Sequence, residues 1–538
     1  MAYYKDLRQY LEALEQQGKL TRIKREINKD TQLHSLARLQ FRGLPDDERT
    51  AFLFENVVDS KGRKYESPVA TAALAGSSQV YAIGMMCKPE EISEKLAQAQ
   101  LNPIEPSLVN DGPVHEEVHL GDKLLEHGGL SEFPIPLTTP GYDASPYITA
   151  GCIVTKDPET GVPNIGLYRA QLKSPTRTGI AWMENQGGLY HWHKCREMGK
   201  PLELAITIGS PPNIAYVAVS KLPFGVSELA VAGGIAGEPV KVVKCKTVDL
   251  EVPATAEIVI EGEVSTTELE PEAPFGEAGG FVGLSGMRPY FTVKCITHRK
   301  KPIWVASVSQ YPPSESSKIR QYATEGVVLK HLRYDLNMQH VSAVAVYDAI
   351  GSFGFIAVKL KKTEPAEIWR TLEAAANSFP SAKIVVAVDE DVNIRDIDPV
   401  NLAICARTQS QYYRTIKMPV MSTKDPYMAS PDKLLTGPGK KQDNQPTEAE
   451  TNEVSCILID ATSKQPLPPL SLPKKEFMDE ALRIWQEEGL PKLQLKEPWW
   501  GINLGAWNEE CEELAKAAVE GDCYKAGELY SQGRRSIG

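Results

Sequence analysis

Long apolar runs, paired cysteines and an excess of basic residues are all missing from this sequence. No apolar stretch approaches the roughly 20 residues that cross a bilayer, and the polar, helical start MAYYKDLRQYLEAL lacks the pattern of a signal peptide. The nine cysteines include no C-x-x-C pair, which argues against a zinc ribbon or a disulfide framework. We therefore expect a cytoplasmic protein with no membrane span.

Charge and motif content exclude further classes of protein. The net charge of −11 argues against a broad nucleic-acid surface, although a local basic pocket stays possible. The sequence has no G-x-G-x-x-G, P-loop, G-x-S-x-G or H-E-x-x-H pattern. A dinucleotide-binding fold, a P-loop NTPase, a serine hydrolase of the nucleophile-elbow type and a zincin are therefore all disfavoured.

The chain is long enough for several domains. With 538 residues, of which 42% are hydrophobic and 24% charged, it exceeds what one hydrophobic core serves, so two or three domains are expected. Its patterns predict an α/β fold with α+β character, divided as follows: an α/β domain over 1–112, a strand-rich barrel or sandwich over 113–308, a linking helix over 309–335, a second α/β domain over 336–470 and a helical tail over 471–538.

Hydrophobic periodicity predicts individual elements within these regions. Tyr4, Leu7, Tyr10, Leu11 and Leu14 recur at helical spacing, and Gly18 can end that helix. Strands are predicted at Leu204–Ile208, Lys241–Thr247, Glu257–Val264, Tyr290–Ile296 and Ile384–Val388. Helices are predicted at Ser314–Arg333, Pro399–Arg407, Lys474–Glu488 and Asn508–Ser531, and a polar linker at 437–454.

The chemical candidates are two glutamates and an arginine. Glu272 and Glu277 lie on either side of Pro274 and Gly276, which cannot continue a helix. Arg169 ends the upstream segment NIGLYR. A guanidinium can hold a carboxylate bidentately, and a crowded glutamate can retain a proton near neutral pH. These residues suggest acid chemistry on a carboxylate substrate, while a surface loop with a salt bridge is the simpler alternative.

Other polar groups favour structural explanations. His191 and His193 would share one face of a strand and could reach one metal ion, but no acidic or cysteine ligand lies beside them at metal-site spacing. A partly exposed aromatic turn is the better interpretation. Asp389-Glu390-Asp391 is more typical of a solvated charge run than of a ligand site. The small residues 232–237 predict a tightly packed helix.

Taken in order, several motifs resemble the UbiD family of prenylated-flavin-dependent (de)carboxylases. The matching segments are PYIT at 146–149, NIGLYR at 164–169, Ser227-Glu228, DLEVPATAEIVIEGEV at 249–264, PEAPFGE at 271–277, PPSES at 312–316 and VDEDVNIRDIDPVNLAICART at 388–408. Each is weak alone, but their order and spacing over roughly residues 1–465 are specific. On these motifs the chain is identified as a member of that family.

The resemblance implies an architecture and a cofactor. It implies an N-terminal α/β domain, a split β-barrel domain that binds the cofactor, a linking helix and a C-terminal α/β domain for oligomerisation as a homodimer or homohexamer. The cofactor would be prenylated FMN, supplied by a flavin prenyltransferase. A divalent metal would hold it, usually manganese with magnesium or iron as alternatives, and potassium (K+) would lie nearby.

The resemblance also assigns residues. Asn164 and Glu228 match the family's metal ligands, and both are oxygen donors, as a hard cation requires. Arg169 and Glu272 match the Arg–Glu pair of the catalytic network, and Glu277 matches the acid that supplies a proton after carbon dioxide leaves. The cofactor would also contact Ile165, Gly166, Leu167, Tyr168 and Gln186.

Two positions depart from the family pattern. The family's third metal ligand is usually histidine, and by its spacing from Arg169 that position is Asn185 here. A family lysine that contacts the cofactor phosphate falls at Cys456, a second position of the predicted cofactor site, and Lys440 or Lys441 could compensate. Both departures concern metal and phosphate binding, and neither concerns the acid–base residues.

The implied activity is reversible non-oxidative decarboxylation of an aromatic or α,β-unsaturated carboxylic acid, or of its CoA ester. Two alternatives stay open: a carboxylase component or cofactor-poor subunit of a larger complex, and a redox protein that uses ordinary FMN. Trp499, Trp500 and Trp507 lie in the tail beyond the matching segments. They favour a subunit interface over a pocket cover, because aromatic residues are enriched at interfaces.

Overall fold

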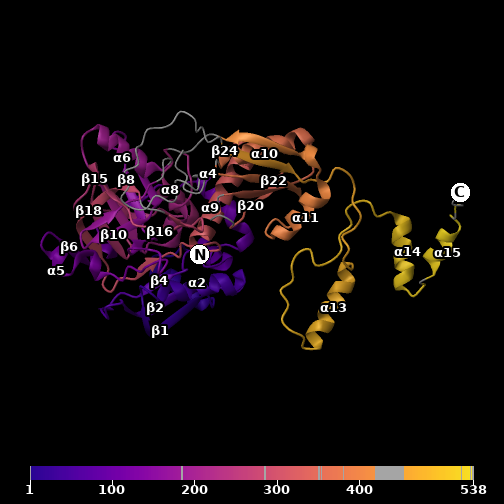
Figure 1. The fold of residues 1–538 in the computed structure, drawn as a ribbon, viewed down its shortest axis with the longest axis horizontal. Coiled ribbons are helices and arrows are strands. Elements are labelled where there is room, and N and C mark those ends of the chain that lie inside the picture. The colour runs from indigo at the N-terminus through magenta and orange to yellow at the C-terminus, as the bar shows by residue number, and fades with distance from the viewer. Residues whose placement is uncertain are drawn as a thin grey trace.

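The computed structural model describes residues 2–182, 186–223, 225–283, 286–348, 352, 354–379, 381–418, 454–522, 524–533 and 535. It is a mixed α/β structure with a curled central sheet, and helices α13 to α15 stand away from its main body (Figure 1). Within these residues, no helix has both the length and the apolar character that a bilayer crossing demands.

The N-terminal sheet draws a strand from far along the chain. Its order is β1 (Leu20–Asn28), β2 (Ala51–Val58), β4 (Val69–Thr71) and β19 (Trp304–Ala306), with β3 (Lys64–Tyr65) on β2. The helices of this part are α1 (Leu7–Gln16), α2 (Leu33–Gly43), α3 (Ser78–Met85) and α4 (Ile92–Leu101). Because β19 follows the central strands, the N-terminal and central parts fold on one continuous core.

Helix α1 shows how the sequence pattern becomes structure. Its start is capped by the Asp6 carboxylate, which accepts a hydrogen bond from the Gln9 amide at 2.9 Å. The predicted apolar face is buried, as Leu7, Tyr10, Leu11 and Leu14 show, and Gly18 follows with a φ of +68°. The predicted helix is confirmed.

The central sheet carries the strands that position the candidate site. Its order is β7 (Tyr147–Ile148), β10 (Ala170–Ser174), β11 (Arg177–Gly179), β18 (Met287–His298), β15 (Ile258–Pro271), β12 (Leu202–Ile208), β8 (Cys152–Lys156) and β9 (Pro163–Leu167), with β6 (Glu117–Leu120) on β18. A smaller sheet joins β14 (Glu251–Pro253), β13 (Lys241–Lys244) and β5 (Ser107–Leu108). The predicted strands of this region are confirmed, although β13 ends before the predicted boundary. The antiparallel pair β15–β18 is its longest ladder.

Short helices pack against this sheet. They are α5 (Lys123–Glu126), α6 (Gly187–Glu197), α7 (Pro212–Ala218) and α8 (Glu228–Ala236). The predicted small-residue helix is α8, where Gly233 and Gly234 let backbone from the end of α4 and the loop after it approach closely: a Cβ at Gly233 would lie 2.3 Å from the Ile104 carbonyl oxygen.

Helix α9 (Glu315–Lys330) connects the central and C-terminal parts and begins with a buried acid. Ser314 caps it. Both oxygens of the Glu315 carboxylate accept backbone N–H groups, from Ala72 and Val308 on one side and from Leu74 and Ala75 on the other. One carboxylate thereby satisfies the amides of two loops that would otherwise be buried without partners.

The C-terminal sheet has the order β20 (Val341–Val346), β21 (Phe355–Leu360), β22 (Ile384–Asp389), β24 (Val454–Asp460) and β23 (Tyr413–Met418), packed with α10 (Pro365–Ser378) and α11 (Ile397–Arg407). The structure corrects the expectation for the acidic run after β22. Asp389 and Asp391 are not merely solvated, because the Arg407 guanidinium, whose side chain is 6% exposed, donates to both. The predicted linker at 437–454 lies almost wholly outside the described residues, which resume at its last position.

The tail contains α13 (Lys475–Glu487), α14 (Glu509–Val519) and α15 (Lys525–Ser531). The prediction of one helix over Asn508–Ser531 is wrong, because α14 ends at Val519 and Gly521 follows with a φ of +98°. That left-handed conformation breaks the helical path. None of the α13 side chains is buried in this chain.

Replacing Glu315 by Gln tests the role assigned to its carboxylate. The amide keeps the size of the side chain but turns one oxygen into an NH₂ group that faces backbone donors. We expect a loss of about 1–3 kcal/mol in stability, measured as a lower midpoint of thermal unfolding. Glu12→Gln, at an exposed position of α1, is the control. An unchanged midpoint for Glu315→Gln would contradict this role.

Candidate active site

Arg169, Glu272 and Glu277 form one cluster. Arg169 lies between β9 and β10, and its Nε and Nη2 donate to the two carboxylate oxygens of Glu272 at 2.8 and 2.7 Å. This is the bidentate geometry that fixes a guanidinium most firmly. Its Nη1 donates to Oε1 of Glu277. The residues proposed from the sequence are therefore brought together, with the arginine between the two acids.

The two glutamates lie on the segment that connects the long strands β15 and β18, which is called the excursion below. Pro271 pairs with Met287, and the intervening segment forms the small hairpin of β16 (Phe275–Gly276) and β17 (Val282–Gly283). The Glu272 amide donates to the Gly286 carbonyl at 2.7 Å, and the Glu277 amide to the Phe281 carbonyl at 2.8 Å. Backbone pairing therefore fixes both acids beside Arg169.

Residues from the segment before β8 hold this excursion in place. The Tyr147 hydroxyl donates to the Ala273 carbonyl at 2.7 Å, and the Gly276 amide donates to the Asp143 carboxylate at 2.8 Å. The Phe275 ring packs against Tyr147 and lies 5.4 Å from the Arg169 guanidinium carbon. Sequence reasoning did not assign Asp143 a role, because its partner amide is more than a hundred positions away and no motif marks the pair.

The electrostatics of the cluster favour a proton on one acid. Burial raises the pKa of Glu277, the Arg169 charge lowers it and the neighbouring Glu272 raises it again, with a net upward shift. Burial alone would lower the pKa of Arg169, but Glu277 and Glu272 together raise it, so the guanidinium stays charged. The arrangement can thus bind a carboxylate and supply a proton beside it.

A second group of oxygen donors gathers at the start of α8. The Glu228 carboxylate is largely buried and accepts a hydrogen bond from the Ile165 amide at 3.2 Å. Burial raises the pKa of Glu228 to about 7, even though backbone N–H groups oppose the shift. A buried carboxylate with so few donors is suited to a cation, which would offset its desolvation.

Asn164 brings an amide oxygen to the start of α6. Its Nδ2 donates to the Tyr168 hydroxyl at 3.4 Å, which turns Oδ1 toward Gly187, where an added Cβ would lie only 2.0 Å from it. Asn164 lies on β9, and the amide of the next residue, Ile165, donates to the Glu228 carboxylate, so both oxygen donors lie at the same part of that strand. They fit the ligand set of a hard divalent cation.

The remaining predicted cofactor contacts lie around β9 and α6. Ile165 and Gly166 are buried on β9, and Leu167 is partly buried. The Tyr168 ring fills the space under Gly166, where a Cβ would lie 2.0 Å from its Cζ. Gln186 precedes the first residue of α6. This segment therefore lies directly beside Asn164 and Arg169.

Not every predicted site residue joins this group. Asn185, Lys440 and Lys441 lie outside the described residues. Cys456 lies on β24, where its side chain is fully buried in the apolar core of the C-terminal sheet. Its Sγ lies 3.7 Å from the Ile457 carbonyl oxygen. The structure therefore does not bring Cys456 to the Arg169 cluster.

The histidine pair of the sequence is not a metal site in this structure. The expectation of a strand or turn is wrong, because His191 and His193 lie on helix α6. Residues two apart on a helix point in different directions. His191 is buried with its Nδ1 3.0 Å from the Thr155 hydroxyl, and His193 is exposed.

Comparisons with known proteins found matching family models, relatives and solved structures. The N-terminal, Rift-related and C-terminal domain models of the family described as 3-octaprenyl-4-hydroxybenzoate carboxy-lyase, or UbiD, match residues 11–100, 107–312 and 320–442. An uncharacterised protein of Synechocystis is 32% identical over 434 residues, covering 75% of this chain and 82% of the relative. An uncharacterised protein of Archaeoglobus fulgidus is 33% identical over 420 residues, covering 75% and 84%.

Two solved structures are similar over most of their length. An evolved dimeric form of the UbiD-class enzyme HmfF from Pelotomaculum thermopropionicum, in complex with prFMN, has a TM-score of 0.72 at 30% identity, covering 87% of this chain and 97% of that one. The vanillic acid decarboxylase of Sedimentibacter hydroxybenzoicus has a TM-score of 0.73 at 26% identity, covering 90% and 100%.

Replacing Arg169 by Met tests the charge balance of the cluster. Because the folded pKa of Glu277 is raised above its ordinary value of 4.5, the stability it contributes is full below that value and is lost as the pH rises through the raised one. Arg169 lowers the pKa of Glu277. Removing Arg169 therefore raises the pH at which the stability contributed by Glu277 is lost. The variant should lose about 3–5 kcal/mol at neutral and alkaline pH and recover part of it in mild acid.

The thermal midpoint measured against pH checks this expectation. Arg177→Met is the matched control, because that guanidinium also pairs with a glutamate, Glu270, but is 43% exposed. The account would be contradicted if the thermal midpoints of Arg169→Met and of the unchanged protein differed by the same amount at every pH.

Proposed function

Since the chain belongs to the UbiD family of carboxy-lyases, we propose that it catalyses the reversible, non-oxidative decarboxylation of an aromatic or α,β-unsaturated carboxylic acid, or of its CoA ester, at the Arg169–Glu272–Glu277 cluster. The observation that carries this proposal is the guanidinium held between two carboxylates, one of which has a raised pKa. The prFMN complex of a neighbour with 30% identity supports prenylated FMN as the cofactor.

The residues around β9 fit a phosphate-bearing flavin held by a metal. Asn164 and Glu228 would hold a divalent cation, for which manganese is the first candidate, and the cation would supply positive charge for a flavin phosphate. Potassium would occupy a neighbouring position. When bound, the prenylated flavin supplies the electron sink that no side chain provides for a carbon losing carbon dioxide.

Arg169 would orient the substrate carboxylate. Glu272 occupies the Nε and Nη2 edge of the guanidinium, so this edge is fixed and the Nη1 side faces the substrate and Glu277. Glu277 in its protonated form leaves Nη1 available to the carboxylate. The bidentate bond to Glu272 keeps the guanidinium from rotating while the substrate binds.

Glu277 would then transfer its proton to the carbon that lost carbon dioxide. The transfer leaves a carboxylate beside Nη1 of Arg169, which stabilises the new charge. Solvent returns the proton before the next turnover. In the opposite direction the Glu277 carboxylate removes that hydrogen as a proton, so a high bicarbonate concentration would favour carboxylation.

An aromatic acid is the substrate class that we favour. Phe275 and Tyr147 pack together with ring centroids 4.4 Å apart next to Arg169, and both are buried, so the guanidinium has apolar surroundings on that side. One neighbour is named as a vanillic acid decarboxylase, which agrees with this class. Oligomers of two or six chains are proposed, and the flavin prenyltransferase would be the cofactor's supplier.

A subunit that needs a partner chain is the second candidate. The neighbour from Sedimentibacter is a two-component assembly by its name, ShVdcCD. Against this alternative stands the complete acid–base cluster, since a cofactor-poor subunit has no need of it. Redox chemistry with ordinary FMN gives no role to the paired acids and is weaker still.

Glu277→Gln tests the acid assignment. The protein is co-expressed with a flavin prenyltransferase, supplied with aromatic acids and their CoA esters, and assayed for carbon dioxide release. We expect the turnover number to fall at least about 100-fold, because general acids contribute roughly 10²–10⁴, while flavin content stays unchanged. Glu270→Gln, outside the cluster, should keep full activity. Full activity in Glu277→Gln would refute the assignment.

Gly187→Ala tests the metal and cofactor site without using activity. The added methyl group would collide with Oδ1 of Asn164, so the amide must turn away from any metal. We expect less divalent metal and less flavin in the purified variant, both counted by mass spectrometry. Gly43→Ala, where no atom lies within 4 Å of the added group, is the control. Equal contents in the two variants would exclude Asn164 as a ligand.

A further inference from the structure

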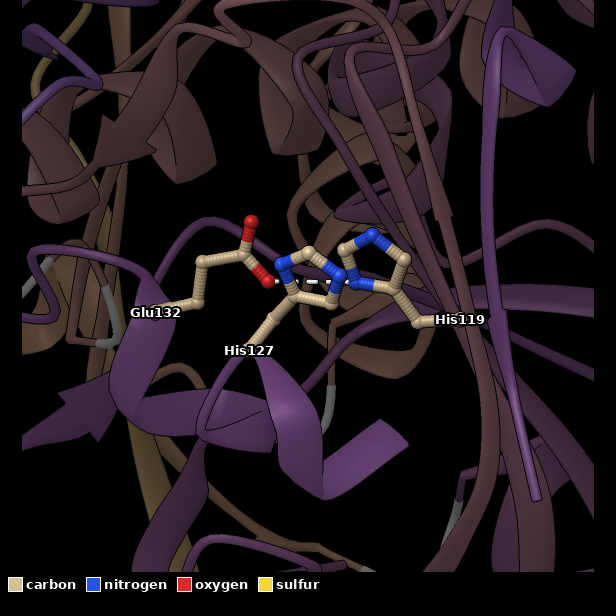
Figure 2. Close-up of side chains that lie close together, drawn as sticks. All are labelled: His119, His127 and Glu132. Carbon is tan, nitrogen blue, oxygen red and sulfur yellow. Dashed lines mark ion pairs between the residues drawn. The ribbon is translucent and has the colours of Figure 1, made fainter. Parts of the chain in front are cut away.

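A second cluster of metal-type ligands lies at the outer edge of the central sheet. His119 is on β6, His127 directly follows the short helix α5, and Glu132 ends a turn of 3₁₀ helix at Gly129–Glu132. One ligand atom from each residue lies within 4.8 Å of the others. Figure 2 shows the two imidazoles beside one another with the carboxylate directed toward them.

The contacts within this cluster are close. The rings of His119 and His127 stack with centroids 4.1 Å apart and 7° between their planes. His119 Nδ1 lies 3.2 Å from Oε2 of Glu132. The other carboxylate oxygen, Oε1, lies 3.6 Å from Nε2 of His298, at the end of β18.

Several buried polar atoms here have no hydrogen-bond partner among the described residues. They are His119 Nδ1, Glu132 Oε2 and His298 Nε2, and the His119 and His298 residues are each only 5% exposed. His298 Nδ1 lies 2.8 Å from the Arg299 carbonyl, which can only accept, so that nitrogen carries a hydrogen. Nε2, the other ring nitrogen, faces Oε1 of Glu132 at 3.6 Å. A cation between such acceptors would satisfy them.

His119 is also ready to act as a ligand. Burial, with smaller contributions from His298 and His127, lowers the pKa of His119 to about 4. The neutral imidazole is the form that binds a metal ion. His127 is exposed, so its ring is free to turn.

This cluster is separate from the candidate active site. The excursion that carries Glu272 and Glu277 precedes Met287 at one end of β18, whereas His298 closes the other end. A strand of this length spans roughly 35–40 Å. A metal at the histidines therefore cannot contact the reacting groups.

We propose that His119, His127 and Glu132 bind a transition-metal ion of the zinc class. Two imidazoles and a carboxylate, with no thiolate, suit zinc and related ions. Metal–ligand bonds of about 2.0–2.1 Å require ligand atoms about 3.3 Å apart, so the stacked rings must open and His127 must turn inward. His298 approaches the second oxygen of Glu132 and would orient it. The ion would tie the α5 segment to β6 and β18.

Zinc binding by the full chain tests this proposal. The protein is stripped with a chelator, titrated with Zn²⁺ against a competing indicator and analysed for metal content. A Glu228→Gln background removes the acid of the active-site cation position, so any remaining zinc reports on the histidine cluster. We expect one bound zinc per chain, with nitrogen and oxygen ligands at about 2.0–2.1 Å by X-ray absorption.

His127→Ala and Glu132→Gln, each in that background, should weaken zinc binding at least tenfold, because even partners outside the ligand set contribute about 10–100-fold. His193→Ala, at an exposed histidine on α6, is the control and should bind as tightly as the background. His127 is exposed, so its replacement should leave the fold intact. The proposal would be overturned if no stoichiometric zinc bound, or if His127→Ala bound zinc as tightly as the Glu228→Gln background. The cluster would then be held by contacts among its own side chains.

Discussion

One cation buried with two acids is the constraint on which the candidate site depends. Arg169 is paired with Glu272 and Glu277, and all three side chains are at most 18% exposed. A second guanidinium, that of Arg288, lies 3.6 Å from Glu272 but is 41% exposed. The buried charges of the cluster are therefore two carboxylates and one guanidinium, in a site where an unpaired charge is costly. Glu277 has the raised pKa, so it is the acid on which a proton settles most readily. The property needed for proton transfer thus follows from how the residues are packed.

The fold provides this arrangement through its longest ladder. The segment between β15 and β18 carries both acids. Asp143 and Tyr147, from the chain before β8, bind the backbone of this segment and fix its position. Arg169 enters from the β9–β10 connection. Three separate parts of the chain therefore meet at the guanidinium, which explains why the motifs are individually weak and specific only together.

The residues alone marked Glu272, Glu277 and Arg169 only as candidates, with a surface salt bridge as the simpler alternative, and their roles came from the family resemblance of their motifs. The sequence predicted most strands and helices from their periodicity, including α1 and α9. It did not show that Arg169 lies between the acids, nor that Asp143 supports the hairpin, because such contacts depend on tertiary packing. His191 and His193 were expected in a partly exposed aromatic turn, with a strand as the alternative, and both lie on helix α6. The His119–His127–Glu132 cluster has no recognisable spacing and needs His298 from far along the chain.

The central claim is that Asn164, Glu228 and the Arg169 cluster form a site for metal-held prenylated FMN. The most direct measurement is the mass and absorbance of the flavin in protein co-expressed with a flavin prenyltransferase, with divalent metal counted in the same sample. The account predicts prenylated FMN with one divalent metal at the flavin for each bound cofactor. An empty protein, or ordinary FMN without that metal under the same conditions, would contradict it.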